Sequence, residues 1–270
     1  MIKKKIKKLL AREPDPSYKR RAKIILNSLE LDGKEKVLEI GCGRGFYLKT
    51  LKKLWPNLKI TGVDLNKKYL TEAKKNLAGL KIKLVKGDAQ NLPFVDNSFS
   101  RIIASEILEH VSNDSKALTE IYRVLKPTGI AIITVPNADY PLLWDPLNWF
   151  LEKWFDKHIP SNIWWLAGIW ADHQRLYTKK EIENKIKKSG FKIEKTWSTT
   201  HYCLPFSHFL FYGIGKNLVE KGLFKSMNRF EEKKESCLRD ILLWPIKLIE
   251  SLNRKENYKT SMNLIFKVGK

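Results

Sequence analysis

The sequence contains little cysteine and no long apolar run. Cys42, Cys203 and Cys237 are its three cysteines, and no two of them form a CxxC pair. This scatter excludes a disulfide framework and gives no sign of a cysteine-type zinc site. No run of about 18 uncharged apolar residues is present, so a membrane-spanning helix is not expected. The basic start, residues 1–8, has no apolar region or cleavage site of a signal peptide behind it, so a cytoplasmic protein is expected.

Acidic residues are scarce beside the basic ones. The chain has 29 Asp and Glu against 51 Lys and Arg, a formal net charge of +22. This excess favours a polyanionic partner such as RNA, or an anionic membrane surface. A lysine-rich proteome of thermophilic origin produces the same composition without any such partner. The hydrophobic content of 43% excludes a disordered chain, and 270 residues are enough for one domain with a large core.

From Lys36 onward, short apolar runs alternate with polar stretches of helix length. Strands are expected at residues 37–40, 59–63, 81–86, 101–104, 130–135, 191–194 and 263–268. Such alternation predicts an α/β fold, a three-layer Rossmann-like sandwich around a mostly parallel sheet with right-handed crossovers. We expect one domain over residues 1–270, with a basic helical segment over 1–30 and helical insertions over 137–172 and 198–258.

A glycine-rich loop follows the first expected strand. The segment Glu39-Ile40-Gly41-Cys42-Gly43-Arg44-Gly45 joins that strand to a helix. Glycines let the backbone turn tightly and approach a ligand, and the helix N-terminus offers free N–H groups. The spacing is Gly-x-Gly-x-Gly, whereas the dinucleotide fingerprint is Gly-x-Gly-x-x-Gly. Glu39, two residues before Gly41, would also repel a pyrophosphate.

Acids end the next two strands. Asp64, followed by Leu65, is about twenty residues beyond the loop, where a carboxylate can accept both hydroxyls of a ribose. A helix N-cap is the structural alternative for Asp64. Asp88 and Ala89 follow the third strand, where a carboxylate can receive an adenine amino group.

In this order, these pieces resemble the class I S-adenosylmethionine-dependent methyltransferases. The resemblance is dense over residues 34–136 and continues through Asn91–Phe94, Asp96–Phe99, Leu108–Val111 and Val124–Gly129. Ser100 departs from the family, which often has Asp there. The resemblance implies S-adenosylmethionine as cofactor and a C-terminal strand antiparallel beside the sixth. It implies cofactor contacts from Glu39, Gly41, Cys42, Gly43, Asp64, Leu65, Asp88, Ala89 and Ser105.

A cluster of acids and histidine follows the fourth expected strand. If the segment is helical, Glu106, Glu109 and His110 share one face and can hold a divalent cation. The Glu-x-x-Glu-His pattern is similar to the metal motif of ubiquinone-biosynthesis O-methyltransferases and of plant enzymes that methylate small-RNA 3′ ends. That resemblance implies Glu106, Glu109, His110 and His173 as ligands of Mg, Mn or Zn. Without a metal, His110 is the candidate general base, and Glu106 is the second candidate catalytic residue.

Aromatic residues crowd the first insertion. Six of the nine tryptophans stand there: Trp144, Trp149, Trp154, Trp164, Trp165 and Trp170. Tryptophan suits a membrane interface, and the apolar segments 204–214 and 241–252 are of a length to lie in one. The alternative is a cap whose aromatic side chains form its own core. We expect methyl transfer to oxygen of a small hydrophobic or lipid-like acceptor, and peripheral contact with the inner face of an anionic membrane.

Two other enzyme functions and one non-enzymatic function stay open at this point. The net charge of +22 favours methylation of RNA as one alternative. Methylation of a sugar or glycan is the other. A cofactor-binding, membrane-associated protein without catalysis is the alternative from another class. The sequence leaves the oligomeric state undetermined.

Overall fold

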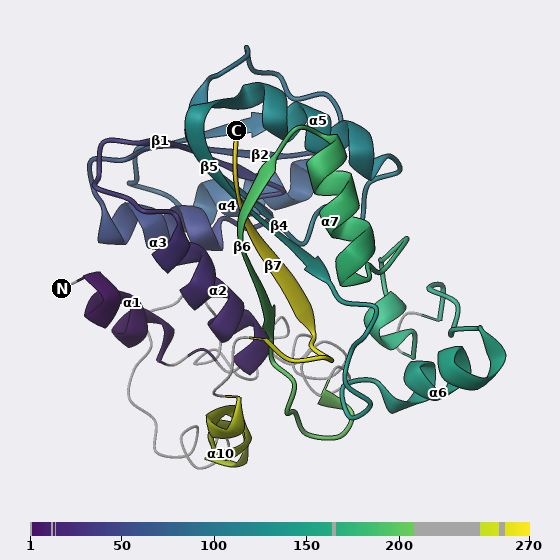
Figure 1. The fold of residues 1–270 in the computed structure, drawn as a ribbon. Coiled ribbons are helices and arrows are strands. Elements are labelled where there is room, and N and C mark those ends of the chain that lie inside the picture. Colours follow the sequence, from purple (N-terminus) through teal and green to yellow (C-terminus); the bar gives the residue numbers. More distant parts are fainter. Residues whose placement is uncertain (1, 12, 14, 164–165, 208–243, 254–256) are drawn as a thin grey trace.

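The expected strands form a single seven-stranded sheet in the computed structural model, which describes residues 2–11, 13, 15–163, 166–207, 244–253 and 257–270 (Figure 1). The strands are β1 (Lys36–Ile40), β2 (Lys59–Asp64), β3 (Ile82–Lys86), β4 (Phe99–Ser105), β5 (Leu125–Pro136), β6 (Lys192–Thr199) and β7 (Asn263–Gly269). Their order is β3-β2-β1-β4-β5-β7-β6. Only β7 runs antiparallel to both of its neighbours, β5 and β6. The predicted Rossmann-like sheet with its antiparallel last strand is therefore confirmed.

Helices cover both faces of the sheet and give the predicted three layers. One face carries α1 (Ile2–Leu10), α2 (Pro16–Ser28), α3 (Phe46–Leu54) and α4 (Lys67–Asn76), and the other carries α5 (Asp114–Val124) and α7 (Lys179–Lys188). Each face has its own apolar core, because the strands bury side chains on both sides. Helices α1 and α2 lie in the basic N-terminal segment, and they bury Ile6, Leu10 and Ile25 against the first face.

Side-chain hydrogen bonds fix the N-terminal end of helix α2. The Asp15 carboxylate accepts hydrogen bonds from the backbone N–H groups of Ser17 (2.9 Å) and Tyr18 (3.1 Å). Pro16 occupies the first helical turn, where its missing N–H has no partner to lose. The Ser17 hydroxyl donates to the Asn263 side chain at the start of β7 (2.7 Å). The N-terminal end of α2 is therefore tied to the edge of the sheet where β7 begins.

The first insertion divides its aromatic side chains between a small core and the surface. It contains α6 (Pro146–Phe155) and a 3₁₀ turn (Gly168–Trp170). The buried Asp145 carboxylate links the two elements, because it accepts hydrogen bonds from the N–H groups of Asn148 in α6 and Ile169 in the turn. Tyr140 and Trp144 pack with Cys203 and Met262, so both insertions contribute to this core. Part of the aromatic set of the first insertion therefore packs within this small core. Trp164, Trp165 and most of the second insertion, residues 208–243, lie outside the described residues.

The outer side of this end of the molecule is apolar. Exposed large side chains gather on the α6 segment and on α10 (Trp244–Leu252), which lie at the end of the sheet where β5 and β6 finish (Figure 1). They include Leu142, Leu143, Leu147, Phe150, Trp154, Phe155, Trp244, Leu248 and Leu252. In the described part of the chain, the helices are all too short or too polar to cross a bilayer.

Candidate active site

A pocket of about 380 Å³ opens at the carboxyl ends of β1, β2 and β3, beside the segment that follows β4. Ligands of open α/β sheets bind at this edge, where the strand order reverses next to β1. Six residues predicted from the sequence line it: Gly41, Asp64, Leu65, Asp88, Ala89 and His110. The lining residues that sequence reasoning missed include Asn66, Ile107 and Val111. The apolar side chains of Ile107 and Val111 carry no local signal, since the sequence only shows that they follow a strand.

The glycine loop turns back on the end of β2. The N–H groups of Gly41 and Cys42 both donate to the Val63 carbonyl (2.9 and 3.0 Å). Gly41 has φ of +68°, and a Cβ placed on it would lie 2.7 Å from the Ile107 side chain. A side chain at this position would therefore be strained in its backbone and would also block the pocket wall.

Asp64 organises the loop and faces the pocket. Its carboxylate accepts one hydrogen bond from the Gly43 N–H and one from the Asn66 N–H, both at 2.8 Å, through different oxygens. A carboxylate has about four acceptor positions, so each oxygen can accept one more donor, such as a ribose hydroxyl. The alternative role of N-cap belongs to Asn66, whose side chain caps α4.

Asp88 and Leu65 also line the pocket, just after the ends of β3 and β2. The Asp88 carboxylate accepts from the backbone N–H of Gln90 (2.8 Å), whose side chain in turn accepts from Ser112 and Asn113. Leu65 is 62% exposed although it lines the pocket, so a planar ligand lying there would bury it. An acid beside an apolar platform suits a purine base with an amino group.

Four predicted cofactor residues lie around the pocket without lining it. Glu39 is buried, its Oε2 has no hydrogen-bond partner among the described residues, and burial raises the pKa of its carboxyl well above the usual range. Cys42 is buried against β2, and burial also raises the pKa of its thiol. Gly43 contributes its N–H to Asp64. Ser105 ends β4, and its hydroxyl lies 3.1 Å from that of Thr134.

The segment Glu106–His110 is not helical, so the condition for a shared helix face is not met. Residues 108–110 form a turn, and Glu106 has a left-handed backbone with φ of +53°. The reason lies in distant partners, because the Glu106 carboxylate accepts from the Thr134 hydroxyl (2.7 Å) and Asn263 amide (2.9 Å) and pairs with Arg21 (3.0 Å). These contacts hold the Glu106 side chain apart from the other three predicted ligands, which lie close to one another.

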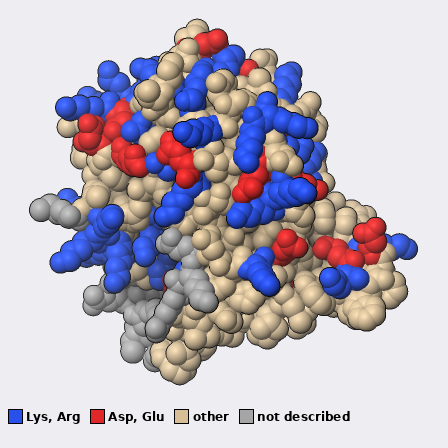
Figure 2. Space-filling model, viewed as in Figure 1, with Lys and Arg blue, Asp and Glu red and all other residues tan. Residues whose placement is uncertain are grey.

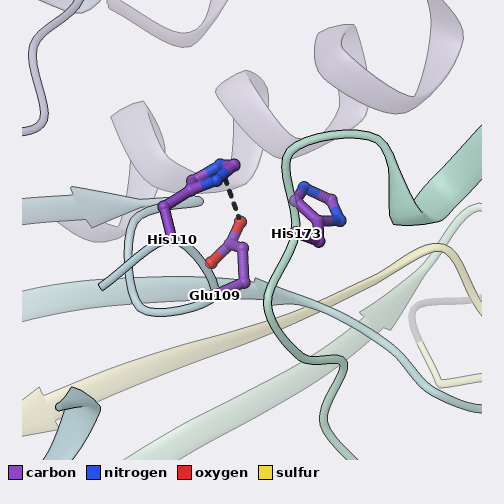
Figure 3. Close-up of side chains that lie close together, drawn as sticks. All are labelled: Glu109, His110 and His173. Carbon is purple, nitrogen blue, oxygen red and sulfur yellow. Dashed lines mark ion pairs between the residues drawn. The ribbon is translucent and has the colours of Figure 1, made fainter. Parts of the chain in front are cut away.

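The side chains of Glu109 and His110, in the segment that follows β4, lie close to the side chain of His173 (Figure 3). One ligand atom from each lies within 4.8 Å of the others, and the His110 Nε2 is 3.9 Å from a Glu109 oxygen. The Glu109 side chain is fully buried, and neither carboxylate oxygen has a hydrogen-bond partner among the described residues. Burial, and then the nearby Glu106 charge, raise the pKa of Glu109 well above its usual range. An isolated acid is costly to bury, so this position suits a group that binds a cation or a proton.

The segment 172–175 positions the histidines. The His110 Nδ1 lies 2.8 Å from the Asp172 carbonyl, so this nitrogen carries the proton and Nε2 faces Glu109. The N–H of Gln174 donates to the Glu109 carbonyl, and Arg175 donates to the Val111 carbonyl (2.7 Å). Asp172 takes a left-handed backbone with φ of +66° at the crossing. Because these bonds join residues more than sixty apart, the local sequence gave no sign of them.

The chain is similar in sequence to known methyltransferases. A family profile described as "Methyltransferase domain" matches residues 38–133. A ubiquinone/menaquinone biosynthesis C-methyltransferase from Desulfotalea psychrophila is 36% identical over 133 residues, which are 47% of this chain and 51% of that protein. A demethylmenaquinone methyltransferase from Lactobacillus johnsonii is 32% identical over 183 residues, 63% of this chain and 73% of that protein. The chain therefore spans about half of the first relative and nearly three quarters of the second.

Solved structures agree on the fold. A methyltransferase from Mesorhizobium loti has a TM-score of 0.55 at 17% identity and covers 91% of this chain and 95% of its own. The phosphoethanolamine N-methyltransferase 2 of Haemonchus contortus, in complex with S-adenosyl-L-methionine, has a TM-score of 0.57 at 22% identity, over 91% of this chain and 51% of its own. With the glycine loop, the strand-end acids and these relatives together, the chain belongs to the class I S-adenosylmethionine-dependent methyltransferases.

Proposed function

We propose that the protein transfers a methyl group from S-adenosylmethionine to the hydroxyl oxygen of a small hydrophobic or lipid-like acceptor. The observation that carries this proposal is the position of His110, which lines the pocket and turns Nε2 toward Glu109. Exposed apolar side chains of α6 and α10 lie at the neighbouring end of the sheet and suit an acceptor of low polarity. Relatives named for menaquinone and for phthiotriol dimycocerosates support an apolar acceptor.

The residues present fit the cofactor. Asp64 retains acceptor capacity on both oxygens, Asp88 and Leu65 form an end for a purine, and the Oε2 of buried Glu39 needs a donor such as an ammonium group. When bound, S-adenosylmethionine supplies a methyl group already activated on a sulfonium. The protein's remaining tasks are to position the acceptor, to exclude water and to remove a proton.

His110 is the proposed base. The acceptor's hydroxyl proton passes to Nε2, and the oxygen forms its bond to the methyl carbon as the carbon–sulfur bond breaks. Asp172 keeps the imidazole in the tautomer whose Nε2 has a free lone pair. A phenol or quinol suits this chemistry, because its ionised form carries negative charge on oxygen and on ring carbons. The products are the methylated acceptor and S-adenosylhomocysteine, with the proton released from His110.

The transfer itself can be tested with a methyl-deuterated cofactor and a set of apolar phenols and quinols. The proposal predicts S-adenosylhomocysteine and an O-deuteromethyl product in equal amounts. A product methylated on a ring carbon, as in the named function of the Desulfotalea relative, would correct the atom attacked and keep the acceptor class. Turnover only with RNA or sugars would contradict the acceptor class.

We also propose a divalent ion, Mg, Mn or Zn, held by Glu109, His110 and His173. The donor set fits, because one buried carboxylate without partners stands beside two imidazoles. Glu106, expected as a fourth ligand, is held by Arg21, Thr134 and Asn263. The ion would act as a Lewis acid toward the acceptor's hydroxyl. In this form of the proposal, His110 is a metal ligand and does not accept the proton of the acceptor's hydroxyl.

Thermal unfolding with and without MnCl₂ tests this ion. We expect manganese to raise the Tm of the wild type by a few degrees and to leave Glu109→Gln unchanged, because the amide cannot supply an anionic ligand. Glu183→Gln removes a carboxylate from α7, away from the cluster, and should behave as the wild type. Equal shifts in all three proteins, or methyl transfer that survives a chelator, would contradict the ion and leave His110 as the base.

Contact with an anionic membrane is the proposed partner interaction. Trp154 and Phe155 at the end of α6 are 70% and 60% exposed, although tryptophan and phenylalanine favour an apolar or interfacial setting. Figure 2 shows Lys and Arg spread over the body of this face, while its lowest edge carries few charged side chains. This combination matches a surface that inserts aromatic side chains and attracts anionic headgroups.

Liposome flotation at low salt measures this contact. We expect the wild type to float with vesicles that contain phosphatidylglycerol, and the double variant Trp154→Ser/Phe155→Ser to lose most of that binding. Val95→Ser is the control, since Val95 is 78% exposed but precedes β4 at the opposite edge of the sheet. No flotation of the wild type would contradict membrane contact.

A further inference from the structure

The loop that carries His110 is bound along its backbone by one distant segment. Residues 106–113 form neither helix nor strand, so the bonds of regular secondary structure do not serve the carbonyl groups of this loop. Donors from residues 174–177 reach five consecutive carbonyls, those of Leu108, Glu109, His110, Val111 and Ser112. Four side-chain donors and one backbone N–H therefore define the course of the loop around His110.

Arg175 supplies most of these bonds. Its Nη1 donates to the Val111 carbonyl (2.7 Å), and its Nη2 donates to the Ser112 carbonyl (3.1 Å). A longer bond joins Nη1 to the Leu108 carbonyl (3.4 Å), so the guanidinium contacts the loop on both sides of His110. A guanidinium presents its N–H groups in a rigid planar fork, whereas a lysine ammonium is a point charge on a flexible stem.

The segment that carries Arg175 is itself fixed to the sheet. The Tyr177 N–H donates to the Pro136 carbonyl, and its carbonyl accepts from the Ala138 N–H, so Tyr177 lies beside the end of β5. The Tyr177 hydroxyl also donates to the Asp114 carboxylate in the first turn of α5 (2.8 Å). That carboxylate lies 3.8 Å from the Arg175 Nη1. Arg175 therefore transmits the position of the sheet to the loop.

The exposure of the loop indicates that these bonds set a position. His110 and Ser112 are exposed residues, and water could serve their carbonyls at little cost in free energy. Fixing an arginine side chain against them costs rotamer entropy. A catalytic group, in contrast, needs an accurate position, because a displacement of about 1 Å can cost roughly a hundredfold in rate.

We propose that Arg175 is a positioning residue for methyl transfer. It holds the backbone around His110 while the Asp172 carbonyl holds the Nδ1 of the ring, so that Nε2 faces Glu109. Both roles proposed for His110, as a base and as a metal ligand, need this orientation of Nε2. Arg175 lies outside the pocket lining and acts through His110. The inference rests on the proposed function and adds a residue on which its rate depends.

Steady-state methyl transfer to the phenol or quinol that the wild type methylates fastest tests the inference. We expect Arg175→Gln to lose roughly ten- to a hundredfold in kcat and to keep its KM for S-adenosylmethionine within about threefold. Arg175→Lys retains the charge without the fork, so its kcat should lie between those of the wild type and Arg175→Gln. Ethylguanidinium should restore part of the kcat of Arg175→Ala, because it supplies a free fork.

Arg101→Gln is the matched control. Arg101 also donates to three backbone carbonyls, but it lies near the start of β4, at the opposite edge of the sheet. Its loss should leave kcat within about twofold, since it removes similar bonds without touching the loop. Wild-type kcat in Arg175→Gln, an equal fall in Arg101→Gln, or no rescue by ethylguanidinium would overturn the inference.

NMR of the imidazole nitrogens, without added metal, reports the same position without any turnover. We expect the His110 ring of the wild type to carry its proton on Nδ1, and that of Arg175→Gln to exchange between both tautomers. The spectrum of His110→Asn assigns the signals. An unchanged His110 signal in Arg175→Gln would overturn the inference, whereas a wild type that methylates no phenol or quinol would contradict the proposed function.

Discussion

The His110→Asn variant is expected to lose a factor of about 10²–10⁴ in kcat, the usual contribution of a general base. Its affinity for S-adenosylhomocysteine should change little, because the other pocket residues retain their contacts. Asparagine keeps a polar group near the Asp172 carbonyl but cannot accept the acceptor's proton. The measurement is single-turnover methyl transfer together with calorimetry on the same preparation.

A second histidine is the control for this experiment. His158 stacks on Trp170 in the first insertion, with ring centres 3.9 Å apart, and lies outside the pocket lining. His158→Asn should leave kcat within a factor of about two, since it removes no group that the proposed chemistry uses. An active His110→Asn protein would contradict both roles proposed for His110, as a base and as a metal ligand.

Asp64→Ala is expected to weaken S-adenosylhomocysteine binding by about a hundredfold or more. Two ribose hydroxyls would lose a charged acceptor, and each such hydrogen bond contributes about 1.5–3 kcal/mol. The variant also frees the N–H groups of Gly43 and Asn66, so the glycine loop keeps its backbone bonds to Val63 but loses its link to the Asp64 side chain. Calorimetry gives the affinity, and circular dichroism checks the fold.

Asp64→Asn separates the two effects. The amide oxygen can replace one of the two carboxylate oxygens as a hydrogen-bond acceptor. Part of the hydrogen bonding in the glycine loop and part of the cofactor affinity should therefore persist. We expect an affinity between those of the wild type and Asp64→Ala. Asp96→Asn alters an exposed acid at the opposite edge of the sheet and should bind as the wild type does. Unchanged binding by Asp64→Ala would contradict the assignment of the ribose site.

The strands were predictable because each is a short buried run between polar stretches. Their predicted bounds differ from the observed ones by at most five residues, with the largest differences at the start of β5 and the end of β6. The chain enters β5 at Leu125 and passes through Lys126–Gly129 before it pairs regularly with β4. That segment reads as a turn, and the strand reaches back to Leu125 because this residue pairs with Phe99 of β4 across an irregular stretch of the ladder.

The site residues that directly follow strands were predictable from the sequence. The residues whose side-chain positions depend on partners far away in the chain were not. Gly41, Asp64 and Asp88 reach the pocket because parallel strands end at one edge. Glu106 does not share a helix face with Glu109 and His110, because Arg21 and Asn263, from opposite ends of the chain, hold its carboxylate. Arg21 itself stands among lysines and arginines in a basic helix, so its burial has no signal in the local sequence.

Calorimetric titration of the purified chain with S-adenosylhomocysteine and, separately, with NADH tests the central assignment most directly. The two ligands share an adenosine, but only NADH places a pyrophosphate next to the glycine loop, where buried Glu39 opposes it. The account predicts one saturable site for S-adenosylhomocysteine and no binding of NADH at the same concentrations. Tight binding of NADH without binding of S-adenosylhomocysteine would contradict it.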